Sequence, residues 1–272
     1  MLRRLRALRW PVIASATIVV LGGGCALSRL WEPSRERVLQ RILPSAVQIV
    51  VEQQEGRRFR TGSGVVIAAR PGPGGTDCFV LTSGHTVAGT IGQKELYVLF
   101  GRHRGVGTKE RATVLAYRES AEMDIALLHA RSEECEPARP GRPAALGEAV
   151  WVIGFPWGRS ILLASGIVSQ VNTDDTGDRE LASRLMVDAS VSYGSSGGGV
   201  YDARTGGLIG LVEGYRTARL SSQGTDPAWF IDVPVPGQTF VTPLAEIRRF
   251  LSDAGHAGLV EGAPASVRRA ER

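Results

Sequence analysis

The sequence predicts an all-β fold, an antiparallel sandwich or barrel, on two observations. Many short runs rich in β-branched and other apolar residues are separated by loops of Gly, Pro, Asp and Arg, and helical periodicity is confined to two short segments. The length of 272 residues allows one domain of two packed sheets or barrels, or two small domains. A hydrophobic content of 43% and a charged content of 22% are ordinary for a soluble globular protein.

The first thirty residues predict a targeting segment. They contain five arginines and no acidic residue, so they carry the whole net charge of +5 and the rest of the chain sums to zero. This location argues against a basic surface for nucleic acid. An uncharged apolar run at 11–27 follows the first four arginines, as in an export signal or a membrane anchor.

The stretch "LGGGC" ends this run and resembles a bacterial lipoprotein cleavage site at Cys25, although Gly22 stands where leucine is usual. Three outcomes stay open: lipidation of Cys25, an uncleaved membrane tether, or ordinary signal cleavage. All three place the folded domain outside the cytoplasm.

A linker and a short helix are expected at 31–43, stopped by Pro44. The β-runs then follow at 46–52, 62–69, 78–83, 96–100, 111–117, 124–130, 149–154, 161–169, 184–190, 198–202 and 207–214. The segments 69–77 and 172–178 are expected to be loops between them. A second helix is expected near the end, where apolar residues recur on one face at Leu244, Ile247, Phe250 and Leu251. Residues 256–272 hold little apolar sequence and predict a flexible tail.

Three patterns contain residues that could carry chemistry. His85 lies in "LTSGHTVAG", Asp124 opens the β-run "MDIALLHA", and two adjacent serines lie in "DASVSYGSSGGGV". Each alone is weak, because a lone histidine is usually structural, aspartate is a common turn residue, and Gly and Ser are common in loops. Together they supply a nucleophile, a base and a carboxylate that orients the base, as serine catalysis requires.

The pattern G-x-S-G-G selects Ser196 as the nucleophile. Gly194 and Ser196 can turn their amides into one pocket for an oxyanion, and Ser195 is the variable position. The same stretch also matches G-x-S-x-G, the nucleophile elbow of α/β-hydrolases, which would use Asp232 and His256 as the other two catalytic residues. That elbow must lead into a helix within alternating strands and helices, whereas here glycine-broken β sequence follows.

The order His85, Asp124, Ser196 resembles that of the chymotrypsin-fold (trypsin-like) serine proteases, and further motifs are similar to their bacterial Deg/HtrA branch. These motifs are "LPSAVQIV", "GSGVVI", "VIGFPWG" with "ASGIVS", the nucleophile segment, and "FVTPLAEIRRFL". The resemblance covers about residues 40–253 and implies a protease domain at 44–255. Within it, two antiparallel six-stranded β-barrels are expected at about 44–135 and 145–242, with a C-terminal helix at 243–253.

The resemblance implies an exported serine endopeptidase that acts on proteins or peptides through an acyl-enzyme, in the bacterial periplasm or cell envelope. It allows a homo-oligomer. Too little sequence follows the second helix for the peptide-binding PDZ module typical of the branch. A catalytically weak or inactive binding or chaperone module is the alternative. Three positions depart from the family pattern, namely Gly84 for alanine, Ser195 for Asn or Asp, and Gly199 for proline.

The resemblance also implies further site residues. The strand "GLVEG" is expected to run along the bound peptide, with Ser190, Val212, Glu213 and Gly214 in the substrate site. Glu213 would either favour a basic residue before the cleaved bond or point to solvent. Cys78 and Cys135 are expected to meet at the far end of the first barrel as a disulfide, with two separate thiols as the alternative. No metal-ligand spacing and no cofactor fingerprint occurs in the sequence, so neither is implied.

Overall fold

The computed structural model describes residues 33–53, 56–89, 94–120, 123–171, 185–221 and 229–260. The chain divides into Met1–Ser34 and a compact unit from Arg35 onward, and the elements below belong to the second. The expected export signal and Cys25 lie outside the described residues, as does the expected tail from 261 onward. Residues 256–260, also expected in the flexible tail, instead form the 3₁₀ turn Ala257–Leu259, with Leu259 and Val260 buried against the core. Within the described ranges, no helix is long and apolar enough to cross a membrane.

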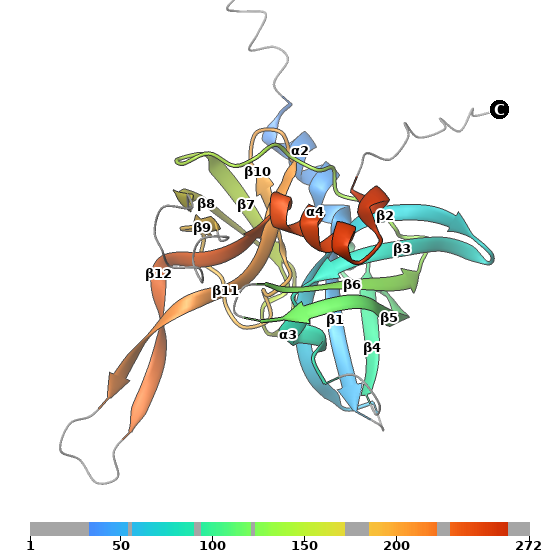
Figure 1. Ribbon diagram of the computed structural model, residues 1–272, viewed down its shortest axis with the longest axis horizontal. Helices are drawn as coiled ribbons and strands as arrows, with labels where there is room; N and C mark the ends of the chain where they lie inside the picture. The colour runs from blue at the N-terminus through green and yellow to red at the C-terminus, as the bar shows by residue number, and fades with distance from the viewer. Residues whose placement is uncertain are drawn as a thin grey trace, which may run out of the picture. The chain divides into compact units, whose positions relative to one another are not determined.

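The compact unit consists of two closed antiparallel barrels of six strands each and a C-terminal helix, which confirms the predicted fold class (Figure 1). Barrel 1 has the strand order β1-β2-β3-β6-β5-β4. Its strands are β1 Ala46–Gln53, β2 Arg58–Gly72, β3 Gly75–Thr82, β4 Lys94–Phe100, β5 Thr108–Glu119 and β6 Asp124–Arg131. Val47, Ile49, Val98 and Leu128 are fully buried in its interior, so the apolar side of each strand faces inward.

Barrel 2 repeats this arrangement with the order β10-β11-β12-β9-β8-β7. Its strands are β7 Ala149–Gly154, β8 Leu162–Val171, β9 Leu185–Val187, β10 Gly199–Asp202, β11 Leu208–Ser221 and β12 Phe230–Pro243. The interior is lined by small and β-branched side chains, among them Val152, Val168, Val187 and Val200. These are the residues that fit a half-buried pleated surface.

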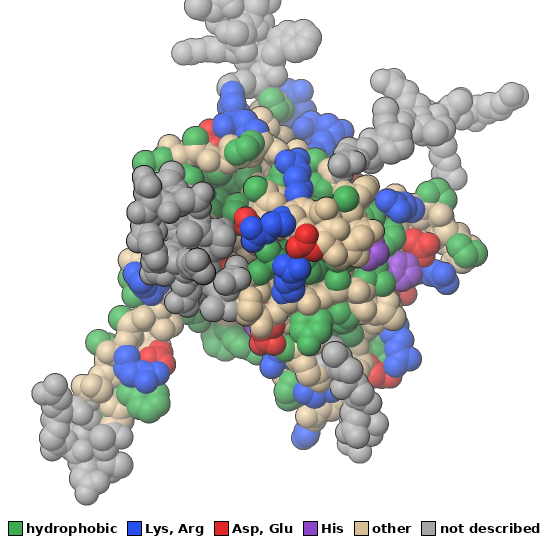
Figure 2. Space-filling view, viewed as in Figure 1, with side chains coloured by type: hydrophobic (Ala, Val, Ile, Leu, Met, Phe, Trp, Pro, Cys, Tyr) green, Lys and Arg blue, Asp and Glu red, His purple; other side chains and the backbone are tan. Residues whose placement is uncertain are grey.

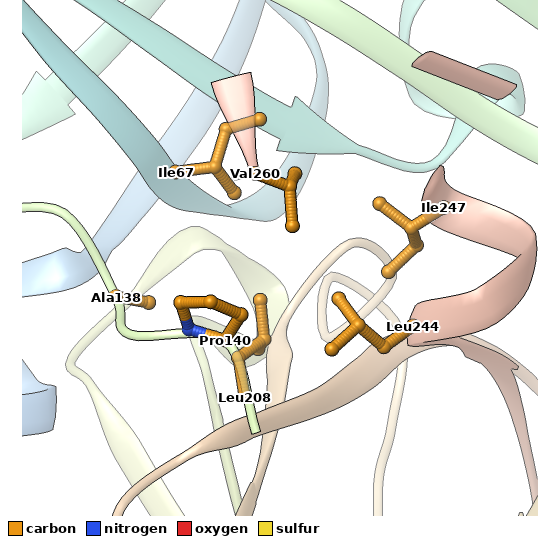
Figure 3. Close-up of a pocket in the computed structure, with 7 residues that line it drawn as sticks. All are labelled: Ile67, Ala138, Pro140, Leu208, Leu244, Ile247 and Val260. Carbon is orange, nitrogen blue, oxygen red and sulfur yellow. The ribbon is translucent and has the colours of Figure 1, made fainter. Parts of the chain in front are cut away.

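A third apolar cluster joins the barrels to the two expected helices, α2 (Arg35–Ile42) and α4 (Leu244–Asp253). Val38 and Ile42 of α2 and Ile247 and Phe250 of α4 are buried in it. Figure 3 shows a small apolar cavity within this cluster, lined by Ile67, Ala138, Pro140, Leu208, Leu244, Ile247 and Val260. Over α4 and the neighbouring strands, acidic and basic side chains are intermingled (Figure 2).

Strand β12 is not among the expected β-runs, and two further segments also differ from the sequence-based expectation. Residues 69–77, expected to be a loop, continue β2 and β3 as a paired hairpin that turns at Pro73 and Gly74, with Pro71 opposite Thr76. Strand β11, expected to end at 214, continues to Ser221 and pairs with β12 as a two-stranded arm that extends away from the barrel (Figure 1). The arm has no buried face to impose an alternating pattern, and cross-strand pairs such as Arg219–Asp232 hold it instead.

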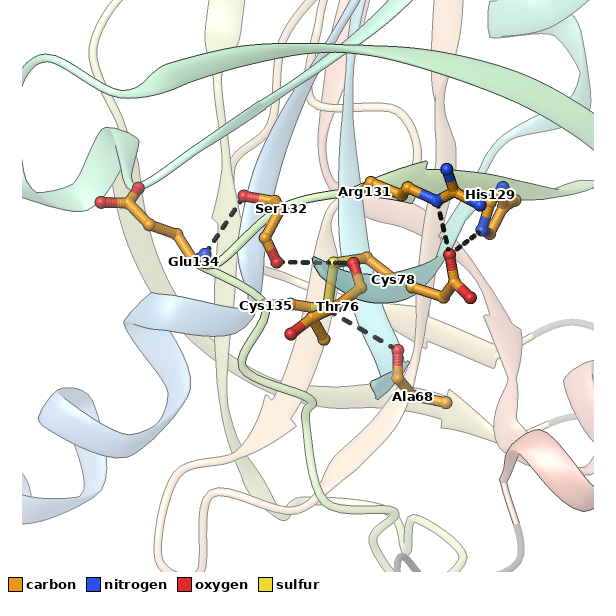
Figure 4. Close-up of a disulfide and its surroundings, with 9 residues drawn as sticks. Ala68, Thr76, Cys78, His129, Arg131, Ser132, Glu134 and Cys135 are labelled. Carbon is orange, nitrogen blue, oxygen red and sulfur yellow. Dashed lines mark hydrogen bonds and ion pairs between the residues drawn. A yellow bond between two sulfur atoms is a disulfide. The ribbon is translucent and has the colours of Figure 1, made fainter. Parts of the chain in front are cut away.

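A disulfide joins Cys78 of β3 to Cys135, with the two Cα atoms 5.8 Å apart (Figure 4). Cys78 is fully buried, and the bond closes a loop with a sequence separation of 57 residues. It fastens the segment that leaves β6 back onto barrel 1.

Removing this disulfide will destabilise the domain. In the double variant Cys78→Ala/Cys135→Ala, we expect the free energy of unfolding to fall by about 2–4 kcal/mol, because the unfolded chain gains the freedom of the open loop. Urea unfolding of both proteins measures the difference. Wild-type protein treated with reductant should approach the variant, and an unchanged midpoint would contradict the expectation.

Asp77, beside the disulfide, makes stability depend on acid pH. Hydrogen bonds from His129 and Arg131 hold the pKa of Asp77 below its ordinary value of 3.8. A carboxylate with a lowered folded-state pKa stabilises the fold above its unfolded-state pKa, and loses that contribution as pH falls through the folded-state value. We therefore expect wild type to lose more stability than Asp77→Asn between pH 6 and pH 3 in urea unfolding.

Asp253 provides the control for this experiment. Asp253 pairs with Arg118 at 3.1 Å, and both side chains are 46% exposed. Exposed pairs contribute little to stability, so Asp253→Asn should follow the wild-type pH dependence. Equal slopes for wild type and Asp77→Asn would refute the role of Asp77.

Candidate active site

His85 and Asp124 come together at the end of two paired strands of barrel 1. His85 lies in the short helical turn α3 (Gly84–Val87) that follows β3, and Asp124 begins β6, which pairs with β3. The His85 ring Nδ1 lies 2.5 Å from Asp124 Oδ2, and the His85 backbone N–H donates to Asp124 Oδ1 at 2.7 Å. The ionised carboxylate only accepts, so Nδ1 carries the proton and Nε2 is left as an acceptor. The imidazole is 42% exposed and the carboxylate only 11% exposed.

Gly84, one of the three departures from the family pattern, lies where a side chain would not fit. A Cβ at this position would lie 2.1 Å from the carbonyl oxygen of Arg118 and 2.9 Å from Asp124 Oδ1. The close approach of β5 therefore requires glycine at this position. On the other side of the turn, the Arg60 guanidinium donates to the carbonyl oxygen of His85.

The two adjacent serines have different environments. Ser195 is 2% exposed; its Oγ accepts from the backbone N–H of Ser192, and its own N–H donates to the Ser192 carbonyl. Ser195 thus holds the turn together through its hydrogen bonds with Ser192. Ser196 is half-buried. Its Oγ makes no hydrogen bond to His85 in the described part of the chain, a contact that free enzymes often form only with substrate.

Gly197, which follows Ser196, packs closely against barrel 1 just before the histidine turn. It adopts φ +81°, and a Cβ there would lie 2.3 Å from the Ser63 carbonyl oxygen and 2.8 Å from the Ser83 nitrogen. Only a residue without a side chain allows barrel 2 to approach barrel 1 this closely. Gly197, the residue after the predicted nucleophile, therefore packs against Ser83, which lies two positions before His85.

Gly194 and Ser196 present the amides expected for an oxyanion pocket. Gly194 has φ +91°, and a Cβ there would lie 2.8 Å from the Trp157 nitrogen. Among the residues with described structure, neither the Gly194 nor the Ser196 N–H donates a hydrogen bond. The carbonyl groups of the same turn are bonded, since Tyr193 accepts from Trp157 N–H at 2.8 Å and Ser196 accepts from Ser63 N–H at 2.8 Å. The turn is fixed while its two donors stay available.

Ser63 of β2 is a site residue that the sequence analysis did not single out. Its Oγ donates to the Gly194 carbonyl at 2.7 Å and accepts from the Phe155 N–H at 2.8 Å. Thr82 Oγ1 in turn donates to the Ser63 carbonyl at 2.7 Å. Ser63 is fully buried. The motif "GSGVVI" was a signal for this position, because its flanking glycines permit close approach of another segment.

The expected substrate-site residues lie at the start of β11 and before the nucleophile turn. The Val212 side chain is buried in barrel 2, its N–H donates to the Gly198 carbonyl, and its carbonyl accepts from Gly197 N–H and Ser83 Oγ. Glu213 is half-buried, with Thr242 Oγ1 at 3.5 Å from its carboxylate. Gly214 is half-buried and Ser190 is exposed.

Gly199, the third departure, faces a tyrosine ring. A Cβ there would lie 2.5 Å from the ring of Tyr201, which is fully buried and shares a 2.9 Å hydrogen bond with Ser45 Oγ. The tyrosine thus takes the space that a proline ring would fill, and burial raises the pKa of the Tyr201 hydroxyl. Across the described ranges, no cluster of three His, Cys, Asp or Glu side chains is arranged to hold a metal ion.

The family model of the trypsin-like peptidase domain matches residues 62–211. The match spans more than half of the chain, and the chain therefore belongs to the trypsin-like peptidase family. A "Serine protease HtrA-like" protein of Staphylococcus haemolyticus strain JCSC1435 is 30% identical over 164 residues. That alignment covers 56% of this chain and 24% of the relative, so the chain spans about a quarter of that protein's length.

Solved structures of HtrA-type proteases share the fold. The serine endoprotease from Yersinia pestis matches with a TM-score of 0.60 at 20% identity, covering 83% of this chain and 68% of its own. The HtrA-type protease AlgW with tripeptide matches at 0.60 and 21% identity, covering 82% and 65%. The inactive form of the Rv3671c protease of M. tuberculosis matches at 0.56 and 24% identity, covering 80% and 92%. At these identities the likeness shows the fold, and with the HtrA-like relative it confirms the resemblance stated from the motifs.

Removing the Ser63 hydroxyl will loosen the contact between the barrels. In Ser63→Ala, the Gly194 carbonyl and the Phe155 N–H lose their shared partner, and we expect the free energy of unfolding to fall by about 2–4 kcal/mol. Ser83→Ala is the matched control, because Ser83 is also buried but its acceptor, the Val212 carbonyl, keeps the Gly197 N–H. That control should cost about 1 kcal/mol or less. Equal losses in the two variants by urea unfolding would contradict the role of Ser63.

Proposed function

We propose that the domain is a serine endopeptidase that cleaves protein substrates through an acyl-enzyme, with His85, Asp124 and Ser196 as its catalytic triad. One observation carries the proposal. Asp124 holds both the ring Nδ1 and the backbone N–H of His85, which fixes the imidazole with Nε2 as an acceptor. Membership of the trypsin-like peptidase family supports the same reaction class.

The first half of the reaction forms the acyl-enzyme. Ser196 Oγ attacks the carbonyl carbon of the scissile bond while His85 Nε2 takes its proton, and Asp124 stabilises the resulting imidazolium. The carbonyl oxygen becomes an oxyanion, which accepts hydrogen bonds from the N–H groups of Gly194 and Ser196. Each such donor contributes on the order of 3–4 kcal/mol to the transition state in comparable sites. The C–N bond then breaks, and His85 gives its proton to the leaving amine.

The second half releases the acyl group. A water molecule loses a proton to His85 Nε2 and attacks the ester carbon, and the same two N–H groups hold the second oxyanion. The ester C–O bond breaks, His85 returns the proton to Ser196 Oγ, and the carboxylic acid product leaves. The acyl half of the substrate would run along Val212–Gly214 at the start of β11, as in the family.

Export to the periplasm or cell envelope is part of the proposal. The arginine-rich start, the apolar run at 11–27 and Cys25 support targeting through the N-terminus. The disulfide between Cys78 and Cys135 suits an oxidising compartment. Attachment to the membrane is proposed from the N-terminal segment, and assembly into a homo-oligomer is proposed from the family resemblance.

Ser196 should be the residue that reacts with an active-site-directed probe. A fluorophosphonate should label wild-type protein, with the modified peptide identified by mass spectrometry. Ser196→Ala should lose labelling and proteolysis, because in the proposed mechanism its hydroxyl is the one that His85 activates and that the unbonded N–H groups of Gly194 and Ser196 serve. Ser195→Ala is the matched control and should retain labelling, since Ser195 Oγ is buried within the turn. A folded wild-type protein that resists the probe would favour the inactive binding or chaperone module instead.

A further inference from the structure

We propose that Trp157 and Tyr193 form a subsite for an apolar side chain of the substrate, on the leaving-group side of the cleaved bond. The inference rests on the proposed function and adds a substrate preference to it. Trp157 belongs to the 3₁₀ turn Pro156–Gly158 that follows β7, and Tyr193 immediately precedes Gly194 of the oxyanion pocket.

The two aromatic rings are exposed beside the candidate active site. Trp157 is 64% exposed and Tyr193 is 48% exposed. Their ring centroids lie 5.3 Å apart with the planes tilted by 38°. Large aromatic side chains that stay accessible next to a reactive group form a ready apolar contact surface.

The turn that carries Trp157 is rigid. Phe155 is fully buried, and the Gly158 carbonyl accepts from Gln48 Nε2 at 3.0 Å and from the Arg58 guanidinium at 3.2 Å. Gly158 N–H donates to the Phe155 carbonyl at 3.0 Å. Trp157 is held at both sides, so a ligand on its ring meets a surface that is already ordered.

The backbone of Trp157 is strained. Its φ of +57° makes it the sole non-glycine residue with a positive φ among those described. A bulky residue adopts this conformation only where its surroundings impose it, and such strain concentrates at functional sites. Here the strained conformation directs the Trp157 N–H to the Tyr193 carbonyl at 2.8 Å.

That hydrogen bond orients the oxyanion pocket. The Tyr193 carbonyl and the Gly194 N–H belong to one planar trans peptide, so they point in opposite directions. Binding of the carbonyl by Trp157 therefore turns the Gly194 N–H away from Trp157. A side chain seated on the two rings would reinforce this arrangement, because it contacts both residues that make the bond.

The placement of the rings assigns the side of the substrate. The strand proposed to carry the acyl half is bonded to Gly197 and Gly198, which follow Ser196. Tyr193 precedes Ser196 in the nucleophile turn, and Trp157 contacts Tyr193 through its N–H and its ring. A peptide that passes Ser196 from β11 then places its leaving half toward the two rings. The subsite therefore accepts the first or second residue after the cleaved bond.

The surroundings favour an apolar side chain over a cationic one. The Arg58 and Arg102 guanidiniums donate to the carbonyl groups of Gly158 and Arg159, the two residues after Trp157. Their positive charges disfavour a lysine or arginine on the rings, although aromatic faces otherwise attract cations. A large apolar side chain such as phenylalanine, leucine or methionine can contact the two rings without meeting this repulsion.

The test uses a fluorogenic peptide that wild type cleaves at one mapped bond. It is made in two versions, with Phe-Phe or Gly-Gly after that bond. Wild type should cleave the Phe-Phe peptide with a kcat/KM about tenfold or more above that of the Gly-Gly peptide. In Trp157→Ala the ratio should fall below about twofold, while Trp157→Phe, which keeps a ring, should retain most of the preference.

Controls separate this inference from the proposed function. Trp229→Ala removes another exposed tryptophan, 55% accessible and immediately before β12, and should keep the wild-type ratio. Fluorophosphonate labelling at Ser196 reports the function itself, since the probe has no peptide on the leaving-group side. Labelling without any preference for Phe-Phe, a preference for Lys-Lys or Asp-Asp, or a preference that survives in Trp157→Ala would overturn the subsite. Absent labelling and absent cleavage would overturn both proposals.

Discussion

The two barrels supply different parts of the candidate site, so hydrogen bonds across their interface set its geometry, and Ser63 makes several of them. Its N–H binds the Ser196 carbonyl, and its hydroxyl links the Gly194 carbonyl to the Phe155 N–H. The carbonyl groups of the nucleophile turn are bonded through this residue and through Trp157. The Gly194 and Ser196 N–H groups are left available, which is the arrangement that stabilises an oxyanion without reorganisation.

Close backbone approach is the second constraint, and it accounts for positions where the chain departs from its family. Gly84 is needed because the Arg118 carbonyl lies where a Cβ would stand. Gly199 faces the buried Tyr201 ring, whose hydroxyl shares a hydrogen bond with Ser45 before β1. In each case a neighbour fills the space of the missing side chain, so the substitution does not leave a cavity. Ser195, the remaining departure, binds the turn by accepting a hydrogen bond from the Ser192 N–H.

The Trp157–Tyr193 pair connects substrate contact to the same pocket. The turn that carries Trp157 is held by Gln48 and Arg58 from barrel 1, while its N–H holds the Tyr193 carbonyl in barrel 2. Recognition of a side chain on these rings and orientation of the Gly194 N–H therefore share one rigid segment. A purely apolar pocket would add only binding energy. A substrate side chain on these two rings would also help to orient the Gly194 N–H toward the reacting carbonyl group.

The all-β class, most of the strands, the two short helices and the order of the three candidate catalytic residues could be predicted from the sequence. These follow from local signals, namely alternation of apolar residues, turn residues, and glycines around Ser196. It did not reveal Ser63, the strain at Trp157 or the arm beyond residue 214. The two hydrogen bonds of Ser63 Oγ join residues that are 131 and 92 positions apart, and the arm has no buried face to leave a pattern. Only the closure of both barrels brought these groups together, because hydrogen bonds between distant segments depend on packing that no local stretch encodes.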